Sequence, residues 1–163
     1  MTRNVVVLLV LALGCGSDSP VNVAGTYTLS LTVQKNECGI LGNSVGESAS
    51  GVPMVVTQSG TDVQGQIQGL GGLALGIAMG TDTFTGKVSG DSLDLSIDGT
   101  MAGSAGTCAF TRNARMRAEL AGDVLTGTVT YTFATNCTAD CGIRDTCQDV
   151  QVFNGTRPPS VGP

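Results

Sequence analysis

Hydrophobic and polar residues alternate along most of the chain beyond residue 24. Between Thr26 and Val33, the odd-numbered positions hold Tyr, Leu or Val, and the even-numbered positions hold Thr or Ser. This period of two is typical of a β-strand with one buried and one solvated face. Similar runs between turn residues bring the number of predicted strands to eight. We place them at about residues 24–35, 52–58, 62–68, 82–89, 91–98, 107–120, 124–134 and 147–153.

The connections between these strands are of two kinds, which alternate along the chain. Three are tight turns, at Ser59-Gly60, at Gly90 and at residues 121–123. The other four are long and span residues 36–51, 69–81, 99–106 and 135–146. Successive connections of an antiparallel up-and-down meander lie at opposite ends of the strands. The tight turns should therefore gather at one end of the sheet and the long loops at the other.

This arrangement predicts an all-β fold, an antiparallel up-and-down meander of about eight strands that forms a small closed or nearly closed barrel. Gly65, Gly86 and Gly127 lie on the apolar phase of their strands, where glycine lets a strand bend to close a barrel. A two-sheet β-sandwich is the alternative fold. We predict one barrel domain over residues 24–157 and a disordered tail over residues 158–163.

The first predicted strand opens with Gly25-Thr26-Tyr27. This tripeptide is similar to the Gly-x-Trp that opens lipocalin chains, with Tyr27 in place of the tryptophan. The body of the chain therefore resembles a lipocalin-like eight-stranded barrel. The resemblance implies that a small apolar or amphiphilic ligand binds in the barrel or at its mouth.

The first fourteen residues have the features of an export signal. A positive residue, Arg3, precedes nine apolar residues, and Gly14 then stands directly before Cys15. Nine apolar residues are too few to span a bilayer but fit the apolar region of a secretory signal. The segment resembles a bacterial lipoprotein signal, which implies a signal peptide over residues 1–14 and a lipid on Cys15 that anchors the chain to a membrane. Ordinary secretion, with a cysteine near the start of the chain, is the alternative.

The resemblance to lipoproteins also implies a flexible tether over residues 15–23, whose composition is small and polar. Gly16 after the cysteine resembles the sorting pattern for the outer membrane. The exported chain is thus expected to be held at the cell envelope, with the tether entering the first strand at the tight-turn end.

Composition excludes several functions. The chain has no histidine, so a Ser-His-Asp or Cys-His catalytic arrangement cannot form. The formal charge is −5 and no Lys/Arg cluster is present in the sequence, which argues against binding to nucleic acid. We expect a non-enzymatic protein without a cofactor. A protein-interaction, inhibitor or structural role through disulfide-braced loops is the alternative to ligand binding.

Beyond Cys15, all the cysteines fall at the predicted long-loop end of the meander. An oxidising envelope favours disulfides, and it disfavours a zinc site in a chain that lacks histidine. Cys108 lies beside the end of the next strand, so a Cys108–Cys137 bond is plausible. If the barrel closes, Cys38 lies near both Cys141 and Cys147. The disulfide candidates are Cys38, Cys108, Cys137, Cys141 and Cys147. Because their number is odd, one of these thiols is expected to remain free or to pair with a partner.

Four residues are candidate ligand contacts: Tyr27, Phe110, Arg112 and Tyr131. Counted from Cys108, both Phe110 and Arg112 lie on the inward phase of their strand. An inward arginine must be paired or must meet an anionic ligand. The interpretation that we favour is a β-bulge near residues 112–113 that turns this side chain outward. The apolar segment 70–79 is predicted either to plug the barrel end, as a helical turn or extra strand, or to form a lid or a partner-facing patch.

Overall fold

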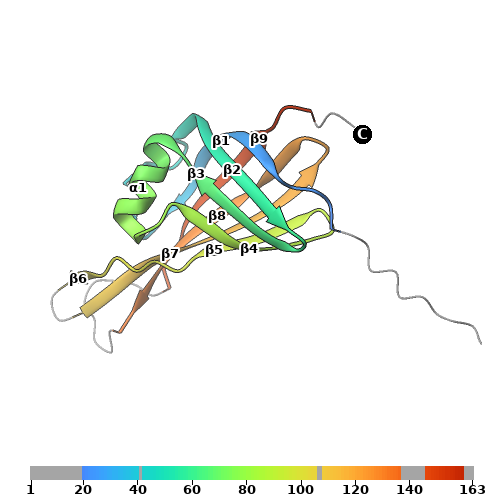
Figure 1. Cartoon of the computed structure of the whole chain (residues 1–163). Coiled ribbons are helices and arrows are strands. Elements are labelled where there is room, and N and C mark those ends of the chain that lie inside the picture. The colour runs from blue at the N-terminus through green and yellow to red at the C-terminus, as the bar shows by residue number, and fades with distance from the viewer. Residues whose placement is uncertain (1–19, 41, 106–107, 137–145, 160–163) are drawn as a thin grey trace, which may run out of the picture.

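The protein is an eight-stranded antiparallel closed β-barrel with one short helix (Figure 1). A computed structural model describes residues 20–40, 42–105, 108–136 and 146–159. The barrel strands are β1 (Gly25–Asn36), β2 (Ser48–Ser59), β3 (Asp62–Ile67), β4 (Thr83–Ser89), β5 (Ser92–Ile97), β7 (Cys108–Ala121), β8 (Val124–Thr135) and β9 (Asp149–Thr156). The helix is α1 (Gly69–Met79), and β6 (Gly103–Ala105) is a short additional strand.

Each barrel strand pairs with the strands before and after it in the chain, as the sequence predicts. The order runs β1-β2-β3-β4-β5-β7-β8-β9, and every pairing is antiparallel. The first and last strands pair with each other, with Leu29 opposite Gly155, and this pairing closes the barrel. The closed meander is therefore confirmed, and the two-sheet sandwich is not the fold.

The structure adds strand residues that carry no alternating pattern. β2 begins at Ser48, where β1 supplies Thr32 as its partner. The first four residues of β2 are exposed, so no apolar position marks them in the sequence. Within the described part of the chain, β6 pairs with β7 alone, opposite residues 108–110. Figure 1 shows β6 and the ends of β7 and β8 projecting beyond the barrel on the side of α1.

Two glycines allow neighbouring strands to approach closely. A Cβ atom added to Gly127 would lie 2.2 Å from the carbonyl oxygen of Arg117, and one added to Gly86 would lie 2.1 Å from that of Asp94. Any side chain at these positions would push the backbone of the neighbouring strand away. Both glycines thus permit the strand curvature that a small barrel needs.

The described part of the predicted tether crosses the tight-turn end of the barrel. The Val21 amide donates a hydrogen bond to the Gly90 carbonyl at 3.2 Å. Val23 is fully buried, and its amide donates to the side-chain oxygen of Gln58 at 2.7 Å. Residues 20–23 therefore pack on the barrel and help to cover its core at this end.

Helix α1 covers the opposite end, where the long loops lie (Figure 1). Its eleven residues carry no charge, and Leu75 and Met79 are buried in the barrel. The helix ends at Gly80, which has a left-handed φ of 89° and donates its amide to the Gly76 carbonyl. The predicted plug over residues 70–79 is therefore a helix, and it also leaves Leu70, Leu73 and Ile77 exposed.

Candidate functional site

A cavity of about 340 Å³ lies between α1 and the barrel interior. Its walls are mainly aliphatic, and a few polar groups come from β8, β9 and the loop after β1. This volume falls in the range of small-molecule binding cavities. The lining residues are Leu29, Leu31, Ile40, Asn43, Ala49, Val52, Ile67, Gly71, Ala74, Leu75, Ala78, Met79, Phe84, Met116, Val129, Tyr131 and Gln151.

Small residues on one side of α1 leave this space open. Gly71, Ala74 and Ala78 line the cavity at helical spacing, whereas the larger Leu75 and Met79 reach into the core. Residues three and four apart lie on the same face of a helix. The helix therefore covers the barrel end without filling it.

A disulfide lies close in the chain to Ile40, one of the residues of the cavity wall. Cys38, after β1, is bonded to Cys147, before β9, with their Cα atoms 5.3 Å apart. The buried carboxylate of Asp149 accepts hydrogen bonds from the amides of Cys38 and Ile40, each at 2.7 Å. Ile40 is itself a lining residue. The bond between Cys38 and Cys147 was one of the two predicted alternatives for Cys38.

The buried polar part of the cavity wall is a pair of side chains on β8 and β9. The hydroxyl of Tyr131 donates a hydrogen bond to Oε1 of Gln151 at 3.1 Å. Both residues are more than nine-tenths buried. Burial, and to a lesser extent the negative charge of Asp149, raise the pKa of the Tyr131 hydroxyl well above its usual range. Tyr131 is thus a neutral hydrogen-bonding group.

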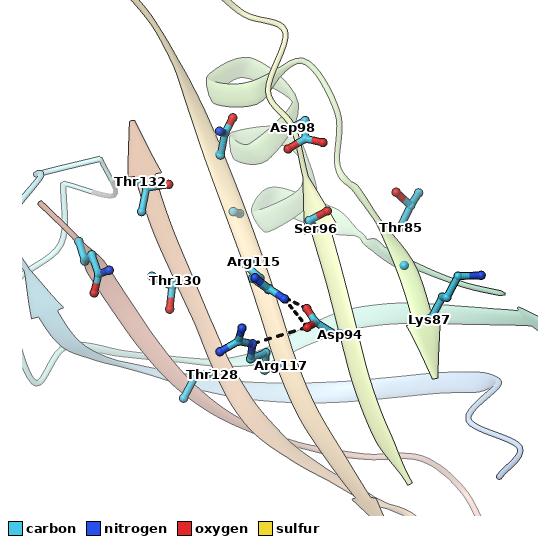
Figure 2. A pocket seen from close by; sticks show the side chains of 14 residues that line it. Thr85, Lys87, Asp94, Ser96, Asp98, Arg115, Arg117, Thr128, Thr130 and Thr132 are labelled. Carbon is cyan, nitrogen blue, oxygen red and sulfur yellow. Dashed lines mark hydrogen bonds and ion pairs between the residues drawn. The ribbon is translucent and has the colours of Figure 1, made fainter. Parts of the chain in front are cut away.

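A larger hollow, of about 890 Å³, lies on the outer surface over β4, β5, β7 and β8 (Figure 2). Hydroxyl groups of threonine and serine line it, together with charged side chains, three of which form ion pairs with one another. Arg115 makes two hydrogen bonds to Asp94, at 2.5 and 2.8 Å, and lowers the pKa of that carboxyl group. Arg117 also faces Asp94, at 3.6 Å. About half of the Asp94 and Arg115 side-chain surface is exposed, so this is a solvated face rather than a binding cavity.

No protein-family model and no curated protein matches this chain. Among solved structures, that of EF1p2_mFAP2b bound to DFHBI is similar to it over 83% of this chain and 93% of the other, with 14% sequence identity. The TM-score of the pair is 0.42.

Of the four predicted ligand contacts, Tyr131 lines the cavity. Tyr27 lies at the tight-turn end of the core, where its hydroxyl donates to the Val23 carbonyl at 2.9 Å. Phe110 and Arg112 lie beyond the barrel, where β7 and β8 project. The phase of Phe110 and Tyr131 was read correctly from the sequence, but the alternation does not show how far along the barrel axis each side chain lies.

Arg112 keeps the inward phase of its strand. The register of β7 with β8 is continuous from Phe110–Thr135 to Ala121–Val124, so the predicted bulge is not formed. The guanidinium lies 5.2 Å from the ring centre of Phe110 and 6.0 Å from that of Phe133. Its Nη1 donates to the carbonyl of Ala78, at the end of α1, at 3.4 Å. Arg112 therefore contacts the carboxyl end of the helix, where a positive charge is favourable.

The remaining predicted sites have different outcomes. Cys15, Cys137 and Cys141 lie outside the described residues, and Cys108 is disulfide-bonded. Over the described ranges, no group of three acidic or cysteine side chains could hold a metal ion. No helix in the same part of the chain is long and apolar enough to cross a membrane.

Sequence reasoning missed Gln151, the second polar group of the cavity. The signal was present, because Gln151 shares a strand phase with Asp149 and with the buried Phe153. Two polar residues on the inward phase of a barrel strand must find partners or face a cavity. Here Asp149 finds backbone amides, and Gln151 faces the cavity with Tyr131.

Proposed function

We propose that this chain is an exported, lipid-anchored, non-enzymatic protein that binds a small apolar or amphiphilic ligand beneath α1. The observation that carries the proposal is the cavity of about 340 Å³ with mainly aliphatic walls and a buried, hydrogen-bonded polar pair. Well-packed protein interiors leave few spaces larger than a water molecule, so a space of this size needs an explanation. The absence of histidine supports a role in binding rather than in acid–base catalysis.

The position of the chain start supports the proposed orientation. The described chain begins at the tight-turn end, and α1 with its cavity lies at the other end (Figure 1). Cys15 precedes Val21 by a span of at most about 20 Å. A lipid on Cys15 would therefore hold the tight-turn end close to a bilayer, with the cavity directed away from it.

The binding proposal is tested with N-phenyl-1-naphthylamine, a neutral dye that fluoresces in apolar surroundings. The Cys15→Ser chain is used, because it lacks the proposed lipid and so needs no detergent. We expect saturable binding that Ala78→Phe weakens at least tenfold, since Ala78 lines the cavity and is partly buried. Ile77→Phe adds a similar ring on the exposed side of α1 and should leave the affinity unchanged.

Equal effects of these two substitutions would place the dye outside the cavity and contradict the proposal. The anchor is tested separately by cell fractionation. We expect the wild-type chain in the membrane fraction and Cys15→Ser in the soluble envelope fraction, and a Cys15→Ser chain that stays with membranes would overturn the lipidation.

The exposed side of α1 favours a second candidate, a protein-interaction role. Leu70, Leu73 and Ile77 are 85%, 60% and 69% exposed on one helix at the long-loop end. Apolar side chains grouped in this way are common in interaction surfaces. Replacing all three by serine should leave dye binding unchanged and should abolish an envelope-protein interaction if this second function is the correct one. Chemical cross-linking in cells provides that readout.

A further inference from the structure

The side-chain amide nitrogen of Gln151 has no hydrogen-bond acceptor among the described residues. Its Oε1 accepts from Tyr131, so the two N–H groups of Nε2 are left to find other acceptors. Among the described residues, the side chain of Gln151 makes no second hydrogen bond. The same residues contain no fully buried side-chain nitrogen or oxygen without a partner. The Nε2 atom therefore retains access to open space, and the space that Gln151 lines is the cavity.

A donor in this position favours a ligand with an acceptor. An amide N–H that enters an apolar complex without a partner loses the hydrogen bond that water gave it, and this loss weakens binding. A purely hydrocarbon ligand would cause that loss when it displaced water from Gln151. A ligand that presents an oxygen to Nε2 would avoid it.

The negative charge of Asp149, next to the Tyr131–Gln151 pair, favours a neutral acceptor on the ligand over a charged one. Asp149 is fully buried, and it lies opposite Tyr131 in the β8–β9 register and two residues before Gln151 on the same strand. Its carboxylate oxygens are held by two backbone amides. Backbone N–H groups satisfy the hydrogen-bonding needs of a carboxylate but do not cancel its charge. A second negative group at Gln151 would be repelled in surroundings of low dielectric constant.

From these contacts we infer that the cavity takes an apolar molecule bearing a neutral carbonyl group, whose oxygen accepts a hydrogen bond from Gln151 Nε2. The site discriminates against the corresponding carboxylate because of Asp149. This inference rests on the proposed function, and it names the ligand class of the same cavity.

The test compares two probes of the same chain length, 2-nonanone and nonanoate, at neutral pH. Each displaces N-phenyl-1-naphthylamine from the Cys15→Ser chain. We expect the ketone to bind at least tenfold more tightly than the carboxylate. Gln151→Leu should weaken ketone binding about three- to tenfold, the loss of one hydrogen bond. Gln64→Leu changes an exposed glutamine on β3 and is the matched control.

Two further variants keep the inference open to contradiction if Gln151→Leu folds poorly. Tyr131→Phe leaves the amide donor in place, so the preference for the ketone should persist. Asp149→Asn removes the charge, and it also takes the acceptor from one of the two backbone amides that Asp149 holds. The readout is therefore the ratio of ketone to nonanoate affinity within this variant, which should fall at least threefold from its wild-type value.

The possible outcomes separate the two proposals. If the dye binds in the cavity but nonanoate competes as well as the ketone, the ligand class is wrong and the proposed function stands. The same conclusion follows if Gln151→Leu binds the ketone as the wild type does. If the dye does not bind at all, the proposed function fails as well.

Discussion

The guanidinium of Arg157 lies over the ring of Tyr27, with its Cζ 5.6 Å from the ring centre. Its Nη1 donates to the carbonyl oxygens of Asn22 and Ala24, at 3.1 and 2.7 Å. Its Nε donates to Asp123, in the turn between β7's end and β8, at 3.1 Å. One nearly buried arginine thus connects the start of the described chain, a tight turn and the core.

Removing this arginine should destabilise the tight-turn end. Arg157→Ala is expected to lower the free energy of unfolding by about 2–4 kcal/mol, because it removes charged hydrogen bonds and a cation–π contact. The control is Arg117→Ala, whose side chain is 64% exposed and whose removal should cost at most about 0.5 kcal/mol. Urea unfolding measures both, and equal losses would contradict the structural role of Arg157.

The disulfide should stabilise the barrel and position the cavity rim. Cys38 and Cys147 are 109 residues apart, and replacing both by alanine should cost about 2–4 kcal/mol, since the unfolded chain then loses a long constraint. The same double variant should bind N-phenyl-1-naphthylamine more weakly, because Ile40 is released from its place. Urea unfolding and dye titration test the two effects. Wild-type stability in the double variant would show that the bond does not stabilise the fold.

Two glycine substitutions should have opposite effects. Gly127→Ala places a methyl group 2.2 Å from a backbone oxygen, so we expect a loss of at least about 2 kcal/mol or a failure to fold. Gly76→Ala in α1 meets nothing within 4 Å and should gain about 0.5–1 kcal/mol, because alanine favours helix and restricts the unfolded chain. Thermal unfolding compares them, and a tolerated Gly127→Ala would contradict the close approach of β7 and β8.

Alkaline pH should destabilise the protein through Tyr131. Its pKa is raised in the folded state, so the folded protein holds a proton that the unfolded chain loses above about pH 10. The contribution of the Tyr131 hydroxyl to the free energy of unfolding is fully present below that pH, and it is lost as the pH rises further. Between about pH 8 and about pH 11, Tyr131→Phe should lose less unfolding free energy than the wild type. Equal losses in urea unfolding would contradict the raised pKa.

Much of the architecture is predictable from local sequence patterns. The alternation in residues 26–33 and in the other runs identifies strands, and the lengths of the connections place Cys38 and Cys147 at one end of the barrel. These features depend on residues near one another in the chain. The start of β2 at Ser48 escapes such an analysis, because exposed residues there pair with β1 without an apolar pattern.

The candidate site was predictable only in part. Tyr131 was identified from its phase, but its partner Gln151 lies on another strand and becomes significant only when β8 and β9 pair. Tyr27 and Arg112 have the correct phase, but neither lines the cavity. A phase gives the side of the sheet that a residue faces, and it does not give the depth of that residue in a closed barrel.

By itself the sequence determined the all-β class, the eight barrel strands, the alternation of tight turns with long loops, and the end at which Cys38 and Cys147 meet. It could do so because period, turn composition and loop length are local properties. The tertiary structure decided that the barrel closes, that α1 covers one end without filling it, and that Arg157 secures the other. A cavity is the volume left between side chains from distant segments, so its position and its polar pair exist only in the folded chain.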